Sequence, residues 1–246
     1  MELLQLNMWQ GRLAQQITEL IDEQKPDFIT AQEIYRGGDT VLAPENMFVL
    51  YEKIAERYLF HSFSAVNALK IARGKAEMGT AIFSQYPIIE QSSFFTHGEY
   101  VDGISVGNDV HNSRTLQSAL LDVNGKKLHI LTHHGHWVPN AYGDAESIQR
   151  MQSIAQYIQT LNQDTPLIFA GDFNVVPESP AMRPLDGLLK DVIASYAIKT
   201  TLSSIKNLDN IVCDHVMVNE GIDVENLYTR DEIVSDHKPL ILDFNL

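Results

Sequence analysis

Short apolar segments of strand length recur along the whole chain. Within them, apolar residues either alternate with polar ones or run continuously, a pattern that favours β-strands buried on one face or on both. So many strands need at least two layers of sheet. The expected strands cover residues 3–8, 27–32, 80–84, 118–123, 127–132, 167–170, 212–218 and 240–244.

Two other segments repeat their apolar residues at helical spacing. The first runs from Leu13 to Ile21, and Pro26 stops it; the second runs from Ile148 to Leu161. The helices do not alternate strictly with the strands. This order favours an α/β sandwich of mixed sheets over a barrel or a Rossmann sheet.

No shift in composition and no linker divides the chain. It has 246 residues, of which 44% are hydrophobic, so it is long enough to bury a large core. We therefore expect residues 1–246 to form a single domain. Residues 35–44, 67–78 and 95–113 are predicted to be long irregular loops, which often carry specificity.

The charge balance is strongly acidic. The chain has 18 Lys and Arg residues against 32 Asp and Glu residues, a formal net charge of −14. Such a field repels polyanions, so long duplex DNA is an unlikely partner. The tight basic cluster is formed by Lys70, Arg73 and Lys75, near Lys53 and Arg57 on a predicted helix. This cluster is either a solvated loop or a local phosphate clamp.

The single cysteine, Cys213, cannot form an internal disulfide, and this fits a reducing compartment. No apolar run approaches the length of a transmembrane helix. We expect a cytoplasmic protein, although a signal peptide already removed would leave no trace. Nothing in the pattern indicates an oligomeric state.

Polar residues suited to catalysis lie at the ends of the expected strands. Active sites of α/β sheets usually lie where strands end, although each of these residues alone could be an ordinary turn or helix cap. They are Asn7, Glu33, His133, Asp172, Asn174, Asp236 and His237.

Together with their neighbours, these residues resemble the ordered motifs of the endonuclease/exonuclease/phosphatase superfamily, the deoxyribonuclease I-like proteins. The resemblance spans nearly the whole chain and implies an α/β fold, a four-layer αββα sandwich of two mixed β-sheets flanked by helices. The matching motifs are Leu6-Asn7-Met8-Trp9, Ala31-Gln32-Glu33, residues 79–84 with Tyr86-Pro87-Ile88, Thr132-His133, Gly171-Asp172-Phe173-Asn174 and Ser235-Asp236-His237-Lys238-Pro239.

The resemblance implies hydrolysis of phosphate esters with Mg²⁺ or Mn²⁺. Such hard cations prefer carboxylate and amide oxygens and neutralise phosphoryl oxygens during the reaction. Glu33 is the expected main metal ligand. Asp236 adds a second carboxylate, and Asn7 either orients Glu33 or touches the metal.

The resemblance also assigns roles in catalysis. Asp172 would orient and deprotonate the attacking water, and Asn174 would donate to a phosphoryl oxygen. His237 would donate to the phosphate while a carboxylate holds its ring. Asp214 is the expected carboxylate, although Val212 and His215 replace the Arg and the aromatic residue usual in that motif.

The segment Thr132-His133-His134-Gly135-His136 allows several interpretations. The family position points to His133 as a contact to the phosphate or an aid to the leaving group. A Zn²⁺ site formed by His133, His134 and His136 is disfavoured, because neighbouring residues of a strand point to opposite faces. The roles of His134 and His136 stay open, and Arg114 is either a substrate contact or part of a structural salt bridge.

Two classes of function fit these residues. The favoured one is a metal-dependent phosphodiesterase or phosphatase that uses direct in-line attack of water on a small or compact phosphoester. A metal-dependent nuclease is the alternative among enzymes. The other class is an inert module that binds a phosphorylated ligand, which the presence of Glu33, Asp172 and His237 argues against.

Overall fold

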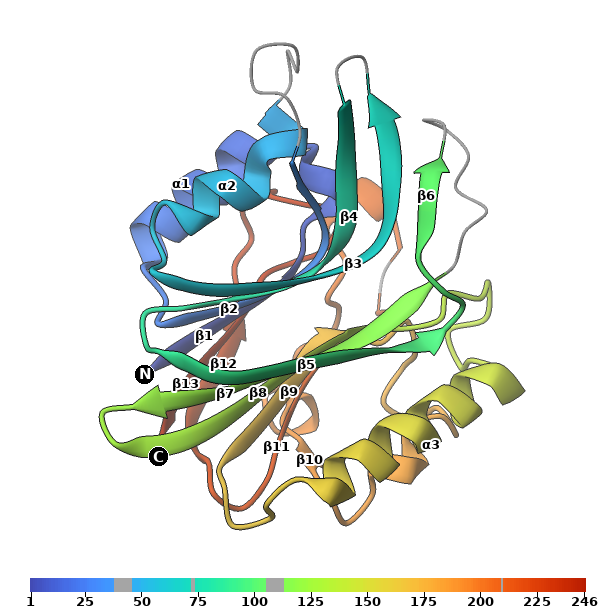
Figure 1. Cartoon of the computed structure of the whole chain (residues 1–246). Helices are drawn as coiled ribbons and strands as arrows, with labels where there is room; N and C mark the ends of the chain where they lie inside the picture. The colour runs from blue at the N-terminus through green and yellow to red at the C-terminus, as the bar shows by residue number, and fades with distance from the viewer. Residues whose placement is uncertain (38–45, 72–73, 105–112, 209) are drawn as a thin grey trace.

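Two mixed β-sheets pack face to face, and helices cover their outer faces (Figure 1). The computed structural model describes residues 1–37, 46–71, 74–104, 113–208 and 210–246. The predicted sandwich of two mixed sheets flanked by helices is confirmed.

The first sheet has seven strands, and two of its neighbouring pairs, β1 with β2 and β3 with β6, are parallel. Its other pairs are antiparallel. In order across the sheet the strands are β12 (Asp223–Thr229), β13 (Leu240–Asn245), β1 (Glu2–Asn7), β2 (Phe28–Arg36), β4 (Gly74–Ser84), β3 (Phe60–Ile71) and β6 (Val101–Ile104).

The second sheet has six strands, and its parallel pair is β8 with β9. The remaining neighbours are antiparallel. In order they are β10 (Lys190–Asp191), β11 (Asp214–Val218), β9 (Leu167–Asp172), β8 (Lys126–His134), β7 (Arg114–Val123) and β5 (Ile88–His97).

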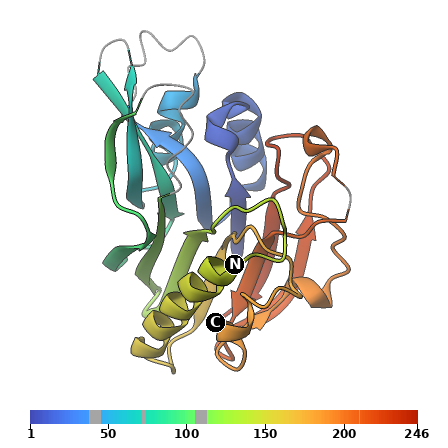
Figure 2. The ribbon, with the colours of Figure 1, turned by 90° about the vertical axis from the view of Figure 1, so that its right-hand side faces the viewer.

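In the described parts of the chain, three α-helices form the outer layers. Helices α1 (Ala14–Gln24) and α2 (Leu50–Ala55) bury their apolar faces on the outer side of the seven-stranded sheet. Helix α3 (Ala145–Thr160) does the same on the six-stranded sheet, and Figure 2 shows α1 and α3 at opposite ends of the stack. Both predicted helices are thus confirmed. The short 3-10 helices are Trp9–Gly11, Asn46–Val49, Arg183–Leu185, Ile193–Ser195 and Ser204–Lys206.

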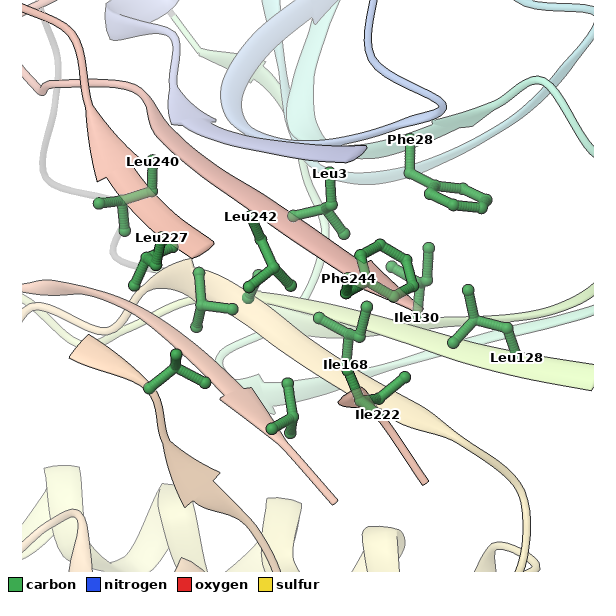
Figure 3. Close-up of a cluster of buried hydrophobic side chains, with 14 of the residues drawn as sticks. Leu3, Phe28, Leu128, Ile130, Ile168, Ile222, Leu227, Leu240, Leu242 and Phe244 are labelled. Carbon is green, nitrogen blue, oxygen red and sulfur yellow. The ribbon is translucent and has the colours of Figure 1, made fainter. Parts of the chain in front are cut away.

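The main core lies between the sheets. Leu3, Phe28 and Leu242 of the seven-stranded sheet meet Ile130 and Ile168 of the six-stranded one, and all five side chains are fully buried (Figure 3). Their burial removes a large apolar surface from water, which is the main force holding sheet on sheet.

The predicted loops are partly wrong. Residues 67–78 lie mostly in a hairpin, since β3 and β4 pair along their whole length and Lys70 lies opposite Lys75. Residues 95–97 end β5, and β6 follows at Val101–Ile104. Tyr35 and Arg36 belong to β2. Within these predicted loops, residues 38–44, 72–73, which include Arg73, and 105–112 lie outside the described residues.

Candidate active site

Three strands of the six-stranded sheet place chemically active side chains in one row. His134, the last residue of β8, lies opposite Asp172, the last residue of β9. Asp172 in turn lies opposite Asp214, the first residue of β11. The cross-strand register therefore holds a histidine and two carboxylates side by side.

The seven-stranded sheet brings Asn7 and Glu33 to this row. Asn7 ends β1, and its Nδ2 donates to Oδ2 of Asp172 at 3.0 Å and to Oε1 of Glu33 at 3.3 Å. Glu33 lies where the register between β2 and β4 shifts, and its φ is +50°. A β-bulge redirects a side chain, and a left-handed backbone at a non-glycine residue is strained and typical of functional sites.

Asp172 is almost fully buried. Its Oδ1 accepts from the backbone N–H of Asn174 at 2.9 Å, while its Oδ2 accepts from Asn7. Burial raises the pKa of Asp172 to about 6, although the charge of His237 and these hydrogen bonds oppose the rise. Asp172 is thus a stronger base than an ordinary carboxylate and is still largely ionised at neutral pH.

His237 lies between two carboxylates. Its Nδ1 is 2.8 Å from Oδ2 of Asp214, and its Nε2 is 3.8 Å from Oδ2 of Asp172. Burial alone would lower the pKa of His237, but the charges of Asp214 and Asp172 outweigh it and hold the pKa well above its usual value. The imidazolium is therefore stable, with Nε2 facing the base.

The two neighbouring histidines of β8 point to opposite sides of the sheet. His133 is buried, its Nδ1 contacts the backbone oxygen of Thr115 at 2.9 Å, and burial lowers its pKa to about 4. His134 instead places Nε2 3.5 Å from Asp172 and 3.8 Å from Glu33. The strand alternation thus gives the site His134, one residue beyond the expected position.

Burial, together with the charge of Arg114, lowers the pKa of His134 well below its usual value. Its ring is therefore neutral at physiological pH, and one ring nitrogen remains able to donate a hydrogen bond. The Zn²⁺ set of His133, His134 and His136, which the sequence disfavours, is not assembled, because His133 faces away and His136 contacts Asp144 and Glu146 at 3.7 and 3.5 Å.

Lys206 is a member of the site that the sequence did not reveal. Its Nζ lies 2.7 Å from Oδ2 of Asp236. The segment is held in place because the backbone of Leu202 bridges that of His237, and the N–H of Ser203 donates to Asp236 at 2.9 Å. Lys206 ends a short 3-10 helix in the connection before β11, where no apolar periodicity marks its position. Its contact with Asp236 is therefore apparent only in the folded chain.

Arg114 and Asn174 converge on one carbonyl. Nε of Arg114 donates to the oxygen of Gly135 at 2.8 Å, and Nδ2 of Asn174 donates to the same oxygen at 3.2 Å. A Cβ at Gly135 would lie 2.0 Å from the backbone oxygen of Phe173, so only glycine fits this approach. The φ of Asn174 is +57°, a second strained backbone at the site.

Most of these residues, but not Asn7, His133 or Asp214, line one cavity of about 540 Å³. Its polar floor contains Glu33, His134, Asp172, Asp236 and His237, with Asn174, Arg114 and Lys206 beside them. Its walls are largely apolar, with Leu69, Met78 and Ile104 on one side and Trp137 and Leu208 also lining it. The volume suits a small molecule.

The donor chemistry fits a hard divalent cation. Glu33 and Asp236 are carboxylates of the floor, Asn7 offers an amide, and the ammonium of Lys206 already acts as a cation for Asp236. Among the described residues, a tighter group of potential ligands joins Asp172, Asp214, His237 and Cys213.

That tighter group is better explained by hydrogen bonding than by metal binding. Nδ1 of His237 is already engaged by Asp214. Burial raises the pKa of Cys213 to about 12, so its thiol stays protonated and is a poor ligand. Cys213 is buried and lies just before β11.

The described part of the basic cluster, which the sequence left as a solvated loop or a phosphate clamp, does not line this cavity. Lys70 and Lys75 do not belong to the lining of this cavity, and Lys75 lies 3.4 Å from Asp102. Arg57 pairs with Asp22 of α1 at 2.5 Å. Arg73 lies outside the described residues. The structure therefore separates the described part of the cluster from the residues of the cavity floor.

A buried polar ladder supports the site from below. Gln5 and Gln32 exchange amide hydrogen bonds at 2.7 and 3.0 Å, and Gln32 also donates to Thr132 across the sheets. Nε2 of Gln5 is 3.4 Å from Oδ1 of Asp214. Gln5 was not predicted to support the site, although a polar residue within the apolar segment Leu3–Leu6 was the feature that could have indicated it.

The sequence matches the Endonuclease/Exonuclease/phosphatase family over residues 4–237. No curated protein matches the chain by sequence. Several solved structures share the fold. One is an endonuclease/exonuclease/phosphatase family protein from Leptotrichia buccalis, with a TM-score of 0.72 and 19% identity over 100% of both chains.

Two further structures with this fold differ in what their names state. A mannosyl-6-phosphatase from Bacteroides thetaiotaomicron has a TM-score of 0.72 and 15% identity over 100% of both chains. The human Nocturnin catalytic domain, with a bound sulfate anion, has a TM-score of 0.73 and 15% identity, covering 100% of this chain and 94% of its own. Identities this low show the fold alone.

Proposed function

The chain belongs to the endonuclease/exonuclease/phosphatase family of phosphoester hydrolases, and we propose that it hydrolyses a small or compact phosphoester with Mg²⁺ or Mn²⁺, by direct in-line attack of water. The observation that supports this most is the meeting of Asp172, His237 and Asn174 in one cavity. Because both sheets supply the residues around it, we also propose that residues 1–246 act as one domain.

In this proposal Asp172 takes the proton from the attacking water. Its Oδ1 is occupied by the N–H of Asn174, and Asn7 and the His237 ring steady Oδ2. The raised pKa of Asp172, about 6, makes it basic enough to accept a proton and leaves it ionised near neutral pH. No covalent intermediate is needed, because water itself is the nucleophile.

Hydrogen-bond donors around Asp172 would stabilise the negative charge that develops on the phosphoryl oxygens. Protonated His237 donates through Nε2, with Asp214 fixing its ring through Nδ1. Asn174 and His134 line the same floor and can each donate to a phosphoryl oxygen or to the leaving group. We therefore transfer the role expected of His133 to His134.

Glu33 and Asp236 would hold the divalent cation, with Asn7 orienting Glu33. When bound, the cation would neutralise phosphoryl oxygens.

No helix among the described residues is both long enough and apolar enough to cross a membrane.

A compact substrate fits both the cavity and the charge. The formal net charge is −14, and the Lys and Arg residues among the described lining of the cavity are Arg114 and Lys206. A protein that binds long duplex DNA needs several cations along the backbone, so a nuclease remains the second candidate rather than the first.

The proposal is tested with purified protein on a panel of small phosphomonoesters and phosphodiesters, with Mg²⁺ and with EDTA. Plasmid and abasic duplex DNA are compared at low and at physiological salt. We expect turnover of at least one small ester that stops with EDTA. Faster DNA cleavage with a steep salt dependence would instead identify a nuclease, and binding without turnover on any substrate would contradict the proposed function.

A further inference from the structure

Three neighbouring strands form an apolar wall beside the catalytic floor. Leu69 of β3 lies opposite Ile104 of β6, and Asn67 of β3 lies opposite Met78 of β4. All four side chains line the cavity that contains Glu33 and His237. The wall therefore consists of two cross-strand pairs, with one polar side chain among three apolar ones.

Asn67 is that polar side chain, and it is 4% exposed. Its Oδ1 is buried and has no hydrogen-bond partner among the residues that the structure describes. A buried acceptor without a donor is costly, so most such groups in folded proteins have a hydrogen-bond partner, and an unpaired one calls for an explanation such as a missing partner. A ligand that brings an N–H or O–H to this wall would satisfy Oδ1.

Trp137 provides a flat surface on the same cavity. It follows β8 in the connection to α3, and it is 60% exposed although it is among the largest apolar side chains. Leu208, from the connection before β11, also lines the cavity and is 49% exposed. Exposed apolar side chains gathered at a concave site mark a binding surface.

The charges of the cavity limit what the leaving group can be. Arg114 donates to Gly135, Lys206 pairs with Asp236, and both lie beside the floor where the phosphate would be held. The described residues of the wall, Asn67, Leu69, Met78, Ile104 and Trp137, carry no charge. A leaving group with further phosphates would find no cation among these five described side chains.

We propose that this wall, hereafter the leaving-group wall (Asn67, Leu69, Met78, Ile104 and Trp137), binds a flat, uncharged, mainly apolar leaving group that carries a hydrogen-bond donor on its edge. The ring stacks on Trp137, and the edge donor is accepted by Oδ1 of Asn67. This inference rests on the proposed function, and it narrows the substrate to phosphoesters of aromatic alcohols or of nucleosides.

The test uses phosphate esters of four alcohols of similar basicity: methanol, benzyl alcohol, carbamoylbenzyl alcohol and acetylbenzyl alcohol. Each is assayed as a monoester and as a methyl diester. The carbamoyl and acetyl groups have nearly the same shape, but only the carbamoyl group donates. The variants are Trp137→Ala and Asn67→Leu, with Leu59→Ala as a matched control because Leu59 is 81% exposed and lies outside this cavity.

We expect kcat/KM for benzyl esters to exceed that for methyl esters by about tenfold or more, which is typical of one well-placed aromatic contact. Trp137→Ala should remove this ratio, and Asn67→Leu should remove the preference for carbamoyl over acetyl. Leu59→Ala should change neither ratio. Equal kcat/KM on all four esters, or preferences that survive both substitutions, would overturn the inference.

A binding measurement separates this inference from the proposed function. Calorimetry compares benzylphosphonate with methylphosphonate, neither of which needs to be hydrolysed. Tighter binding of benzylphosphonate that is lost in Trp137→Ala supports the wall even if every ester resists hydrolysis, and equal binding contradicts it. A comparison of adenosine 5′-phosphate with ribose 5-phosphate then distinguishes a nucleobase from another aryl group. Tighter binding of adenosine 5′-phosphate that is lost in Trp137→Ala identifies a nucleobase. Equal binding of these two ligands, together with a preference for benzylphosphonate, identifies an aryl group.

Discussion

Nδ1 of His237 lies 2.8 Å from Oδ2 of Asp214, so a buried carboxylate fixes both the orientation and the charge of the ring. We predict that the two act as one unit. His237→Ala and Asp214→Asn should each lower kcat by about 10²-fold or more, and the double variant should be little worse than His237→Ala. A double-mutant cycle measured on one phosphoester tests this, and additive losses would show that Asp214 does not act through His237.

Asp172→Asn preserves the shape of the side chain and removes its charge. If Asp172 is the base, the substitution should raise the activation free energy by about 2–4 kcal/mol, and kcat should fall accordingly. Because the pKa of Asp172 is raised to about 6, wild-type kcat/KM should also fall as the pH drops through about 6 or below, where the carboxylate becomes protonated. Retention of most of the wild-type kcat would reduce Asp172 to a structural role.

Lys206 holds a carboxylate oxygen of Asp236 that is also expected to bind the cation. Removing the ammonium frees this oxygen and removes a positive charge, so Lys206→Met should tighten Mn²⁺ binding by roughly three- to tenfold. Calorimetric titration measures this directly. Lys127→Met is the control, since Lys127 pairs with Asp122 elsewhere on the surface at 3.5 Å, and weaker binding in Lys206→Met would contradict the prediction.

His215 shows how a buried pair away from the cavity makes stability depend on pH. Its Nδ1 contacts Asp191 at 2.7 Å and its Nε2 contacts the carbonyl of Val175 at 2.8 Å. Burial alone would lower the pKa of His215, but Asp191 outweighs it and raises the pKa. The stabilisation is therefore complete below the pKa of the unfolded chain and is lost as pH rises through the folded pKa.

Asp191→Asn should remove this pH dependence, and it should cost about 3 kcal/mol below pH 6, where the histidine would be left charged without its partner. Urea unfolding of the wild type and the variant between pH 5.5 and about 9 gives the difference in free energy of unfolding. A difference that stays constant across this range would mean that His215 is not charged in the folded protein.

The sequence predicted the strands that are buried and missed those at the edges. β5 and β12 lie at sheet edges. β5 exposes most of its residues and β12 buries one of its seven, so their polar patterns resemble loops. β3 was hidden because its second half was interpreted as part of a long loop, although it pairs with β4 throughout. Whether such segments form strands depends on pairing and packing with other strands, which the local pattern of apolar and polar residues does not reveal.

The candidate site was predictable where residues lie at the ends of buried strands. Asn7, Asp172 and Asp214 are such residues. In the structure Asn7 donates to Asp172 at 3.0 Å, and His237 contacts Asp214 at 2.8 Å and lies 3.8 Å from Asp172. The sequence pointed to His133 and left the role of His134 open, whereas His134 lines the cavity, because a shift of one residue moves a side chain to the other face of a strand. Lys206 was missed because its place depends on the bridge between Leu202 and His237.

Glu33 lines the floor of the cavity and carries the central claim, because the proposed metal-dependent hydrolysis requires its carboxylate there. The most direct measurement is the rate of hydrolysis of bis(p-nitrophenyl) phosphate by the wild type and by Glu33→Gln across a Mg²⁺ titration, with thermal unfolding as the check on folding. The wild-type rate should depend on Mg²⁺ and disappear with EDTA, and Glu33→Gln should be slower by about 10²-fold or more at every Mg²⁺ concentration while it stays folded. Hydrolysis by the wild type that ignores EDTA, or a Glu33→Gln variant with the wild-type rate and the wild-type Mg²⁺ dependence, would contradict a metal-dependent phosphoesterase at this site.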